Sequence, residues 1–181
     1  MTTATTVHPP APVVDPSMLR NVLGNFCTGV TVITAHDGER PYGFACQSVT
    51  SLSLEPPFVS FCPAKTSSSW PAMREAGRVC INVLAGDQRD LCGSFARSGG
   101  DKFAGADWAP GDNGAPALHG VIASIEAELE FEHDAGDHTI AVCRVTALDA
   151  GRDVHPLLFF RGGYGSFASA EASEGVPGGA R

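Results

Sequence analysis

The chain has 181 residues, 43% of them hydrophobic and 18% charged, with a formal net charge of -8 at neutral pH. This length and composition predict one globular domain with a substantial hydrophobic core. The acidic balance, without any cluster of lysines and arginines, argues against nucleic acid or an anionic membrane as a partner. No apolar run approaches the roughly 20 residues that a membrane-spanning helix needs.

The two ends of the sequence differ in composition from the rest. Residues 1–14 are rich in Thr, Pro and Ala, residues 168–181 in Ala, Ser, Gly and Glu, and both are expected to be flexible tails around a domain at 15–167. The start of the chain lacks a basic region followed by an apolar core, so no secretory signal is recognised and a cytoplasmic location is expected. The six cysteines form no C-x-x-C pair and are expected to be reduced and mostly buried.

The first predicted element is a helix. Asp15 suits the N-cap and Pro16 the first helical position. Apolar residues then recur at helical spacing: Met18, Leu19, Val22, Leu23 and Phe26. Gly29 can end the segment. The predicted helix therefore has one apolar face.

Short strands are predicted along most of the remaining chain. Asp37-Gly38 is the strongest hairpin signal. Strands are expected at residues 28–34, 42–50, 58–62, 79–84, 125–132, 139–148 and 156–161. Short helices are expected at 70–77 and 87–97, the second with Asp87 as its cap. Many antiparallel strands with few helices suggest a closed or partly closed barrel rather than a doubly wound sheet.

Four glutamates alternate with apolar residues in the strand at 125–132. The apolar positions are Ile125, Ala127, Leu129 and Phe131, and the acidic positions are Glu126, Glu128, Glu130 and Glu132. Strict alternation is typical of an antiparallel strand with one wet face. The glutamates are therefore interpreted as a solvated face rather than as a metal site.

The run from Tyr42 to Cys62 carries the strongest functional signal. Small and hydroxyl residues are concentrated in it: Ala45, Cys46, Ser48, Thr50, Ser51 and Ser53. Small residues allow a flat ligand to approach the backbone, and hydroxyls and backbone amides then bind its polar edge. The alternative is an ordinary strand followed by a loop rich in Ser and Thr.

In its residue pattern the chain resembles the flavin reductase family, the small partners of two-component flavin-dependent monooxygenases. The resemblance rests on this run and on segments that occur in the family's order: Phe26–Thr34, Ile81–Leu84, Asp101–Phe103, Gly136–His138, Pro156–Arg161 and Tyr164. It implies a flavin-binding split β-barrel with Greek-key connections, a homodimer, and a flavin groove near the subunit interface. The residue pattern of this run most resembles that of reductases that serve hydroxylation of phenolic rings, including steroid-derived ones.

The resemblance also implies an activity and its cofactors. The chain is expected to transfer a hydride from NADH to FMN or FAD and to supply reduced flavin to a separate oxygenase. NADPH is less favoured, because the chain is acidic and has no arginine cluster. Such hydride transfer needs aligned rings rather than a protein nucleophile. No Rossmann, P-loop, nucleophile-elbow or zinc-protease motif is present, which agrees with this chemistry.

By this resemblance the flavin ring lies along Ala45, Cys46, Gln47 and Ser48, with Gly43, Phe44 and Ser51 in the same run. The segment from Cys62 to Ser69 is predicted to bind the flavin phosphate through Cys62, Pro63, Lys65, Thr66, Ser67 and Ser68. A lysine charge, hydroxyl donors and a helix N-terminus would together attract an anion. The alternative is a plain serine-capped helix with a surface lysine.

The remaining candidates lie in the second half of the chain. Phe95 and Lys102 are expected over the flavin; the alternative for Lys102 is a simple pair with Asp101. His138 is the candidate catalytic residue facing the nicotinamide; the alternative is a turn histidine bound to Asp137. Arg161 and Tyr164 are expected on the dinucleotide side.

Two other functions agree with the same residues. One is a flavin-binding carrier or electron-transfer protein without its own NADH turnover. The other is a relative that reduces a different acceptor, such as a corrinoid or a ferric complex, through flavin. Because one fold can support several functions, the choice between them depends on the residues of the site.

Overall fold

The computed structural model describes residues 14–167, so apart from Val14 the predicted tails lie outside the described residues. The fold is mainly β, with three short helices: α1 (Pro16–Leu23), α2 (Trp70–Ala76) and α3 (Arg89–Ala96). Within the same span, no helix combines the length and the hydropathy needed to cross a membrane.

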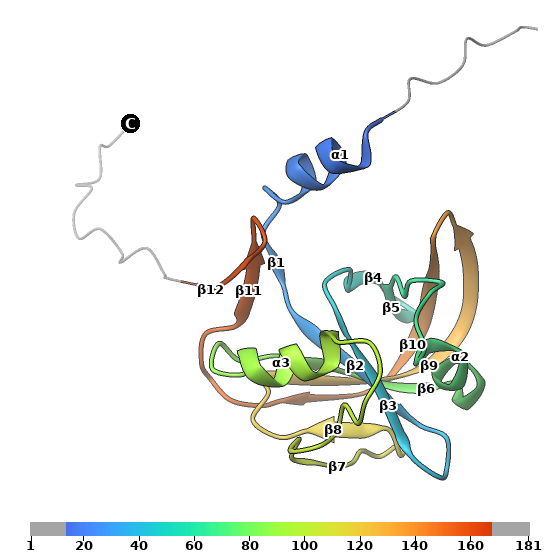
Figure 1. Cartoon of the computed structure of the whole chain (residues 1–181). Coiled ribbons are helices and arrows are strands. Elements are labelled where there is room, and N and C mark those ends of the chain that lie inside the picture. Colours follow the sequence, from blue (N-terminus) through green and yellow to red (C-terminus); the bar gives the residue numbers. More distant parts are fainter. Residues whose placement is uncertain (1–13, 168–181) are drawn as a thin grey trace, which may run out of the picture.

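A seven-stranded antiparallel sheet forms the body of the molecule (Figure 1). In spatial order its strands are β3 (Pro41–Cys46), β2 (Thr31–His36), β6 (Arg78–Val83), β9 (Ala123–Ala135), β10 (His138–Ala150), β5 (Pro57–Phe61) and β4 (Thr50–Leu54). The predicted hairpin at Asp37-Gly38 joins β2 to β3, and Gly38 has a φ of 102°. Strands β3 and β4 form the two edges, and no ladder joins them within residues 14–167.

Two small sheets complete the fold. One contains β1 (Thr28–Gly29), β11 (Leu157–Phe160) and β12 (Gly163–Ser166), and the other contains β7 (Trp108–Pro110) and β8 (Pro116–Leu118). The prediction missed β4, β7, β8 and β12. It also joined β1 and β2, which are separated at Val30, where the backbone N–H donates to Leu157 O and the carbonyl accepts from Leu84 N.

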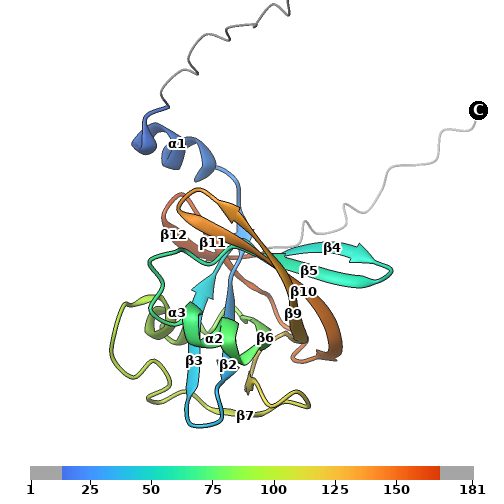
Figure 2. The same ribbon diagram turned by 90° about the vertical axis from the view of Figure 1, so that its right-hand side faces the viewer.

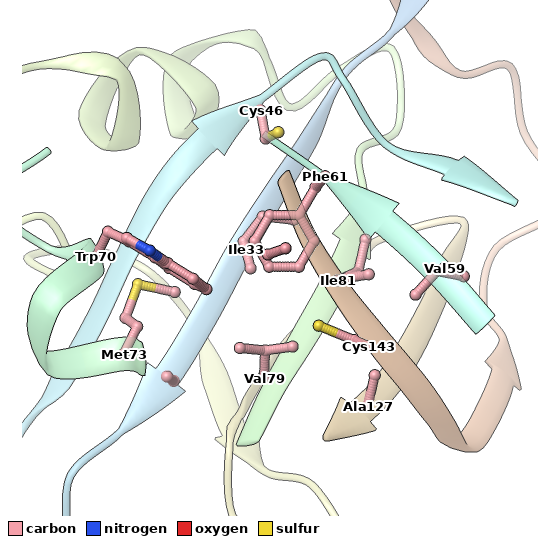
Figure 3. Close-up of a cluster of buried hydrophobic side chains, with 12 residues drawn as sticks. Ile33, Cys46, Val59, Phe61, Trp70, Met73, Val79, Ile81, Ala127 and Cys143 are labelled. Carbon is pink, nitrogen blue, oxygen red and sulfur yellow. The ribbon is translucent and has the colours of Figure 1, made fainter. Parts of the chain in front are cut away.

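Strand β2 is buried on both faces, which places the two later helices. Ile33 and Ala35 point into a cluster with Phe61 and Trp70, shown in Figure 3. Val30 and Val32 belong instead to a cluster with Phe95 of α3. Helices α2 and α3 therefore cover opposite faces of the β2–β3 hairpin, as Figure 1 shows.

A buried polar network fixes the centre of this sheet. Asn82 has no exposed surface, and its amide nitrogen donates to Val32 O at 3.1 Å and to Thr34 Oγ1 at 3.0 Å. Its Oδ1 accepts from the Leu118 backbone N–H at 2.8 Å. Because buried polar groups are costly unless they are hydrogen-bonded, this residue fixes the position of β8 on the sheet.

The first helix forms as predicted, but its apolar face is not buried. Asp15 Oδ1 accepts from the Ser17 N–H at 2.6 Å, and hydrogen bonding to Ser17 lowers the pKa of this carboxyl. The helix ends at Leu23 with Gly24 as its C-cap, not at Gly29. The residues that form this face are exposed: Met18 by 65%, Leu19 by 48%, Val22 by 61%, Leu23 by 60% and Phe26 by 75%. Figure 1 and the view turned by 90° in Figure 2 show α1 standing away from the seven-stranded sheet.

Two further expectations were wrong in detail. Asp87 does not cap α3, whose N-cap is Gln88; its carboxylate instead pairs with Arg152 at 2.9 Å. Glu126 is buried rather than solvated, because it accepts hydrogen bonds from the backbone N–H groups of Asp112 and Asn113. Cys27 is exposed, but Cys46, Cys80, Cys92 and Cys143 are buried, so the cysteines are mostly buried as expected.

Candidate functional site

A groove of about 470 Å³ lies along the outer edge of β3. It brings together most of the predicted site residues, from five separate parts of the chain. Those that line it are Phe44, Ala45, Cys46, Gln47, Ser48, Cys62, Thr66, Ser67, Ser68, Phe95, Lys102, His138 and Tyr164.

Five predicted residues do not line the groove. Ser51 lies in β4, opposite Val59, and the Pro63 carbonyl accepts from the Thr139 N–H. Lys65 Nζ forms an ion pair with Asp134. The remaining two are Gly43, which lies beneath the groove, and Arg161, which belongs to a second cavity.

The Gly43 carbonyl joins the two walls of the groove. It accepts from Ser69 Oγ at 2.9 Å and from Lys102 Nζ at 3.2 Å. Because β3 is an edge strand, its outward carbonyls have no neighbouring strand to pair with, and here side chains bind one of them. The segment before α2 and the segment after α3 are thereby tied to the same backbone atom.

Gly43 also allows close packing of α3. A Cβ atom at this position would lie 2.7 Å from Cε1 of Phe95 and 3.0 Å from the Ile33 carbonyl oxygen. The Phe95 ring is 1% exposed, so it has little space into which it could move. The absence of a side chain at Gly43 therefore sets the position of the wall formed by α3.

Lys102 is neither paired with Asp101 nor free. Its ammonium group donates to the carbonyls of Gly43 and Phe95, at 3.2 and 3.3 Å, and burial lowers its pKa. The Asp101 carboxylate accepts instead from the Phe103 N–H at 3.0 Å. Lys102 thus holds the end of α3 against β3.

The outer edge of β3 also offers backbone groups to a ligand. In an antiparallel sheet the N–H and C=O of one residue point to the same side. Cys46 faces β2, because its carbonyl accepts from Thr31 Oγ1, whereas the Gly43 carbonyl faces the groove. By this alternation the N–H and C=O of Ala45 also face the groove edge, where no strand pairs with them in the described part of the chain.

In the segment predicted to bind the flavin phosphate, some hydroxyl groups are bonded within the protein and others are not. Ser67 Oγ accepts from the Trp70 N–H at 3.2 Å, and Ser69 Oγ is bonded to Gly43. Helix α2 has only seven residues, and its N-cap Ser69 makes no side-chain capping bond. Thr66 and Ser68 are exposed, and within residues 14–167 their hydroxyls have no hydrogen-bond partner. These two remain available to a ligand.

Ser48 has a structural role at the end of β3. Its Oγ accepts from the Cys62 backbone N–H at 2.8 Å and lies 3.2 Å from Cys46 Sγ. These contacts join the end of β3 to the end of β5. Burial raises the pKa of the Cys46 thiol, so this group stays protonated at neutral pH and is a poor nucleophile.

His138 makes the turn contact of the alternative interpretation and also lines the groove. Its Nδ1 lies 2.7 Å from Asp137 Oδ1, and this hydrogen bond lowers the pKa of the Asp137 carboxyl. The imidazole is 44% exposed and also lines the groove. A turn contact through Nδ1 leaves Nε2 available, and the contact fixes the orientation of the ring.

Tyr164 is positioned by two neighbours at the groove wall. Its hydroxyl lies 3.3 Å from Cys92 Sγ, and this hydrogen bond raises the pKa of the tyrosine. The guanidinium carbon of Arg89 lies 5.3 Å from the centre of the ring. Tyr164 is thereby oriented from both its polar and its aromatic side.

Several groove residues were not predicted. They are Val30, Ala64, Cys92, Ala96, Arg97 and Ser98. Periodicity cannot identify Arg97 and Ser98, because they follow the last residue of α3, just before Gly99-Gly100. The only signal was a single arginine at the end of a predicted helix.

A second cavity of about 1410 Å³ lies beside the exposed face of α1. Leu19, Leu23 and Phe26 line it, together with Phe159 of β11 and Arg161. Arg161 has a φ of 48°, and its Nε donates to Asn25 Oδ1 at 2.8 Å. Gln47 and Ser48 line both cavities, so the two are neighbours.

Comparison with known proteins identifies this arrangement. A profile described as the flavin reductase like domain matches residues 23–168. The chain belongs to the flavin reductase family. The reductase is 52% identical over 154 residues to the flavin-dependent monooxygenase reductase subunit HsaB of Rhodococcus jostii strain RHA1, a match that covers 85% of this chain and 79% of that protein.

Two further relatives agree with this assignment. The FMN reductase (NADH) SmoA of Agrobacterium fabrum strain C58 is 46% identical over 149 residues, covering 82% of this chain and 84% of that protein. The NADH:FAD oxidoreductase SgcE6 of Streptomyces globisporus C-1027, solved in complex with NAD and FAD fragments, superposes with a TM-score of 0.82 at 33% identity. That match covers 89% of this chain and 99% of the other. The family predicted from the ordered segments is confirmed, and the protein is a flavin reductase.

Gly43→Ala tests the packing beneath the groove. We expect it to lower the free energy of unfolding by about 1–3 kcal/mol, because the added methyl group must displace Phe95. It should also raise the KM for flavin, since the displaced wall is part of the groove. Urea denaturation and steady-state kinetics measure the two effects.

Gly93→Ala is the matched control in α3, because nothing lies within 4 Å of a Cβ atom built there. In a helix this change should stabilise the protein by about 0.5–1 kcal/mol. A Gly43→Ala protein with wild-type stability and wild-type flavin KM would contradict the proposed role of close packing at this site.

Proposed function

We propose that this flavin reductase transfers a hydride from NADH to FMN or FAD and releases the reduced flavin to a separate monooxygenase that hydroxylates an aromatic ring, phenolic or steroid-derived. The carrying observation is the groove at the β3 edge, which gathers thirteen of the predicted site residues from distant parts of a flavin reductase chain. The similarity to the reductase subunit of a flavin-dependent monooxygenase supports a separate monooxygenase as the partner.

The groove has the features that a flavin requires. Val30, Phe44 and Phe95 give it apolar walls, and the small residue Ala45 allows close approach to the backbone. A bound flavin supplies the hydride acceptor at its N5. The outward backbone groups of Ala45 can bind the polar edge of the ring, where hydrogen-bond donors stabilise developing negative charge.

The residues facing this space orient the reactants and supply no nucleophile. We assign His138 to the nicotinamide: Asp137 holds its Nδ1, and its Nε2 can bond to the carboxamide. Tyr164 is assigned to the same dinucleotide side. Groups arranged in this way contribute by alignment, which is the main requirement of hydride transfer between two stacked rings.

We further propose that the protein is a cytoplasmic homodimer, with the domain at 15–167 forming a split barrel. The exposed apolar face of α1 supports the dimer, because Val22, Leu23 and Phe26 leave a large apolar surface uncovered in a single chain. The adjacent cavity of about 1410 Å³ would receive the second subunit. Its shared residues, Gln47 and Ser48, would bring the subunit interface next to the flavin groove.

NADH consumption by the purified protein tests the activity. We expect little oxidation under air without added flavin and fast turnover with FMN or FAD, because flavin accepts the hydride. The ratio of kcat/KM for the two flavins, and for NADH and NADPH, establishes the preferences. Tight flavin binding without NADH turnover would contradict the proposal and favour the carrier function.

His138→Ala tests the nicotinamide contact. We expect a higher KM for NADH, with a smaller effect on the KM for flavin, because the lost bond belongs to the dinucleotide. His133→Ala is the control, since His133 is an exposed histidine of the same hairpin that does not line the groove. A His138→Ala protein that loses only thermal stability would support the turn role alone.

Sedimentation equilibrium tests the dimer. We expect the wild-type protein to sediment as two chains and Val22→Glu to sediment as one, because a carboxylate on the apolar face of α1 opposes its burial. Ser17→Glu is the control, since it places the same charge in the first turn of α1, where an acidic residue favours the helix. A monomeric wild-type protein would overturn this proposal.

A further inference from the structure

The charged side chains around the groove are few. Among the residues that line it in the described chain, only Arg97, Lys102 and His138 can carry a positive charge. The protein as a whole has a net charge of -8, so it repels an anionic ligand at a distance. A phosphate in this groove therefore needs a local cation.

Two of these three groups already have partners. The Lys102 ammonium is bonded to two carbonyl oxygens, and His138 Nδ1 is bonded to Asp137. Lys65, the cation expected from the sequence, is paired with Asp134 and lies outside the groove.

Arg97 combines a place in the groove with a charge that has no partner in the described chain. It lines the groove, it is exposed, and within residues 14–167 it forms no ion pair. It follows the last residue of α3 with an extended backbone, φ -75° and ψ 148°, so the chain turns away from the helix there. Its guanidinium group is the one groove cation that is not already bonded within the described chain.

The opposite wall supplies matching hydrogen-bond donors. Thr66 and Ser68 line the same groove, and their hydroxyls are available. Ser69 and Lys102 both bond to the Gly43 carbonyl, which ties the segment that carries Thr66 and Ser68 to the segment that carries Arg97. A guanidinium group on one side and two hydroxyls on the other suit a phosphate, which accepts several hydrogen bonds at once.

We propose that Arg97, rather than Lys65, binds the phosphate of the flavin, with Thr66 and Ser68 donating from the opposite wall. This assignment rests on the proposed function. It makes Arg97 a specificity residue that distinguishes phosphorylated flavins from riboflavin, which has the same ring but no phosphate. The contact is the same before and after hydride transfer, so it contributes uniform binding and affects KM rather than kcat.

Arg97→Ala, assayed with FMN and with riboflavin at saturating NADH, tests the proposal. We expect the KM for FMN to rise about tenfold, as loss of a charge-assisted contact implies, with kcat nearly unchanged. The KM for riboflavin should not change. Arg97→Lys, which keeps the charge but loses the planar pair of donors, should give an intermediate KM for FMN.

Arg78→Ala is the matched control, because it removes an exposed arginine that does not line the groove. It should leave both flavin KM values at wild-type level. An Arg97→Ala protein with a wild-type KM for FMN would overturn the proposal, as would an equal rise for FMN and riboflavin, or a rise confined to NADH. If the wild-type protein itself showed no flavin-dependent NADH oxidation, the proposed function would fail instead, and FMN titration of both proteins would still test the Arg97 contact.

Discussion

The unpaired outer edge of β3 is the constraint on which the site depends. An edge strand presents backbone groups that no neighbouring strand bonds, and such groups must find other partners or water. Here Ser69 and Lys102 bind the Gly43 carbonyl, while the backbone groups of Ala45 remain open to the groove. One backbone atom therefore sets the distance between the two walls, and the next outward residue is left for a ligand.

The rigidity of this edge comes from the strand behind it. β2 is buried on both faces, with Ile33 directed to the α2 side and Val32 to the α3 side. The carbonyl of Val32 is bonded to the buried amide of Asn82, which fixes β2 against β6. A displacement of β3 would disturb two packed clusters at once, and packed interiors tolerate such changes poorly.

Local patterns predicted the elements well and the contacts between them less well. The residues from Phe44 to Ser48 line the groove together, because they are consecutive and the first three lie on β3. The role expected for Lys65 came from its nearness in sequence to Thr66 and Ser67, whereas the fold directs it to Asp134, a residue 69 positions away in the numbering. Arg97 shows the opposite case: no pattern surrounds it, and only the fold brings it to the groove. For α1, helical periodicity predicted an apolar face, but periodicity does not show what covers such a face.

The same geometry explains how a reductase can bind flavin and still release it. Thr66, Ser68 and Arg97 are exposed, so a phosphate bound there would remain near solvent, where screening limits the strength of charged contacts. The buried parts of the groove are apolar side chains and protonated thiols, such as Cys46, which form no covalent bond to the ring. Binding would then come from stacking area, a few backbone bonds and one exposed cation. Such a set of contacts suits a flavin that must leave in its reduced form for a second protein, whereas a buried ion pair at the phosphate would suit a permanently bound cofactor.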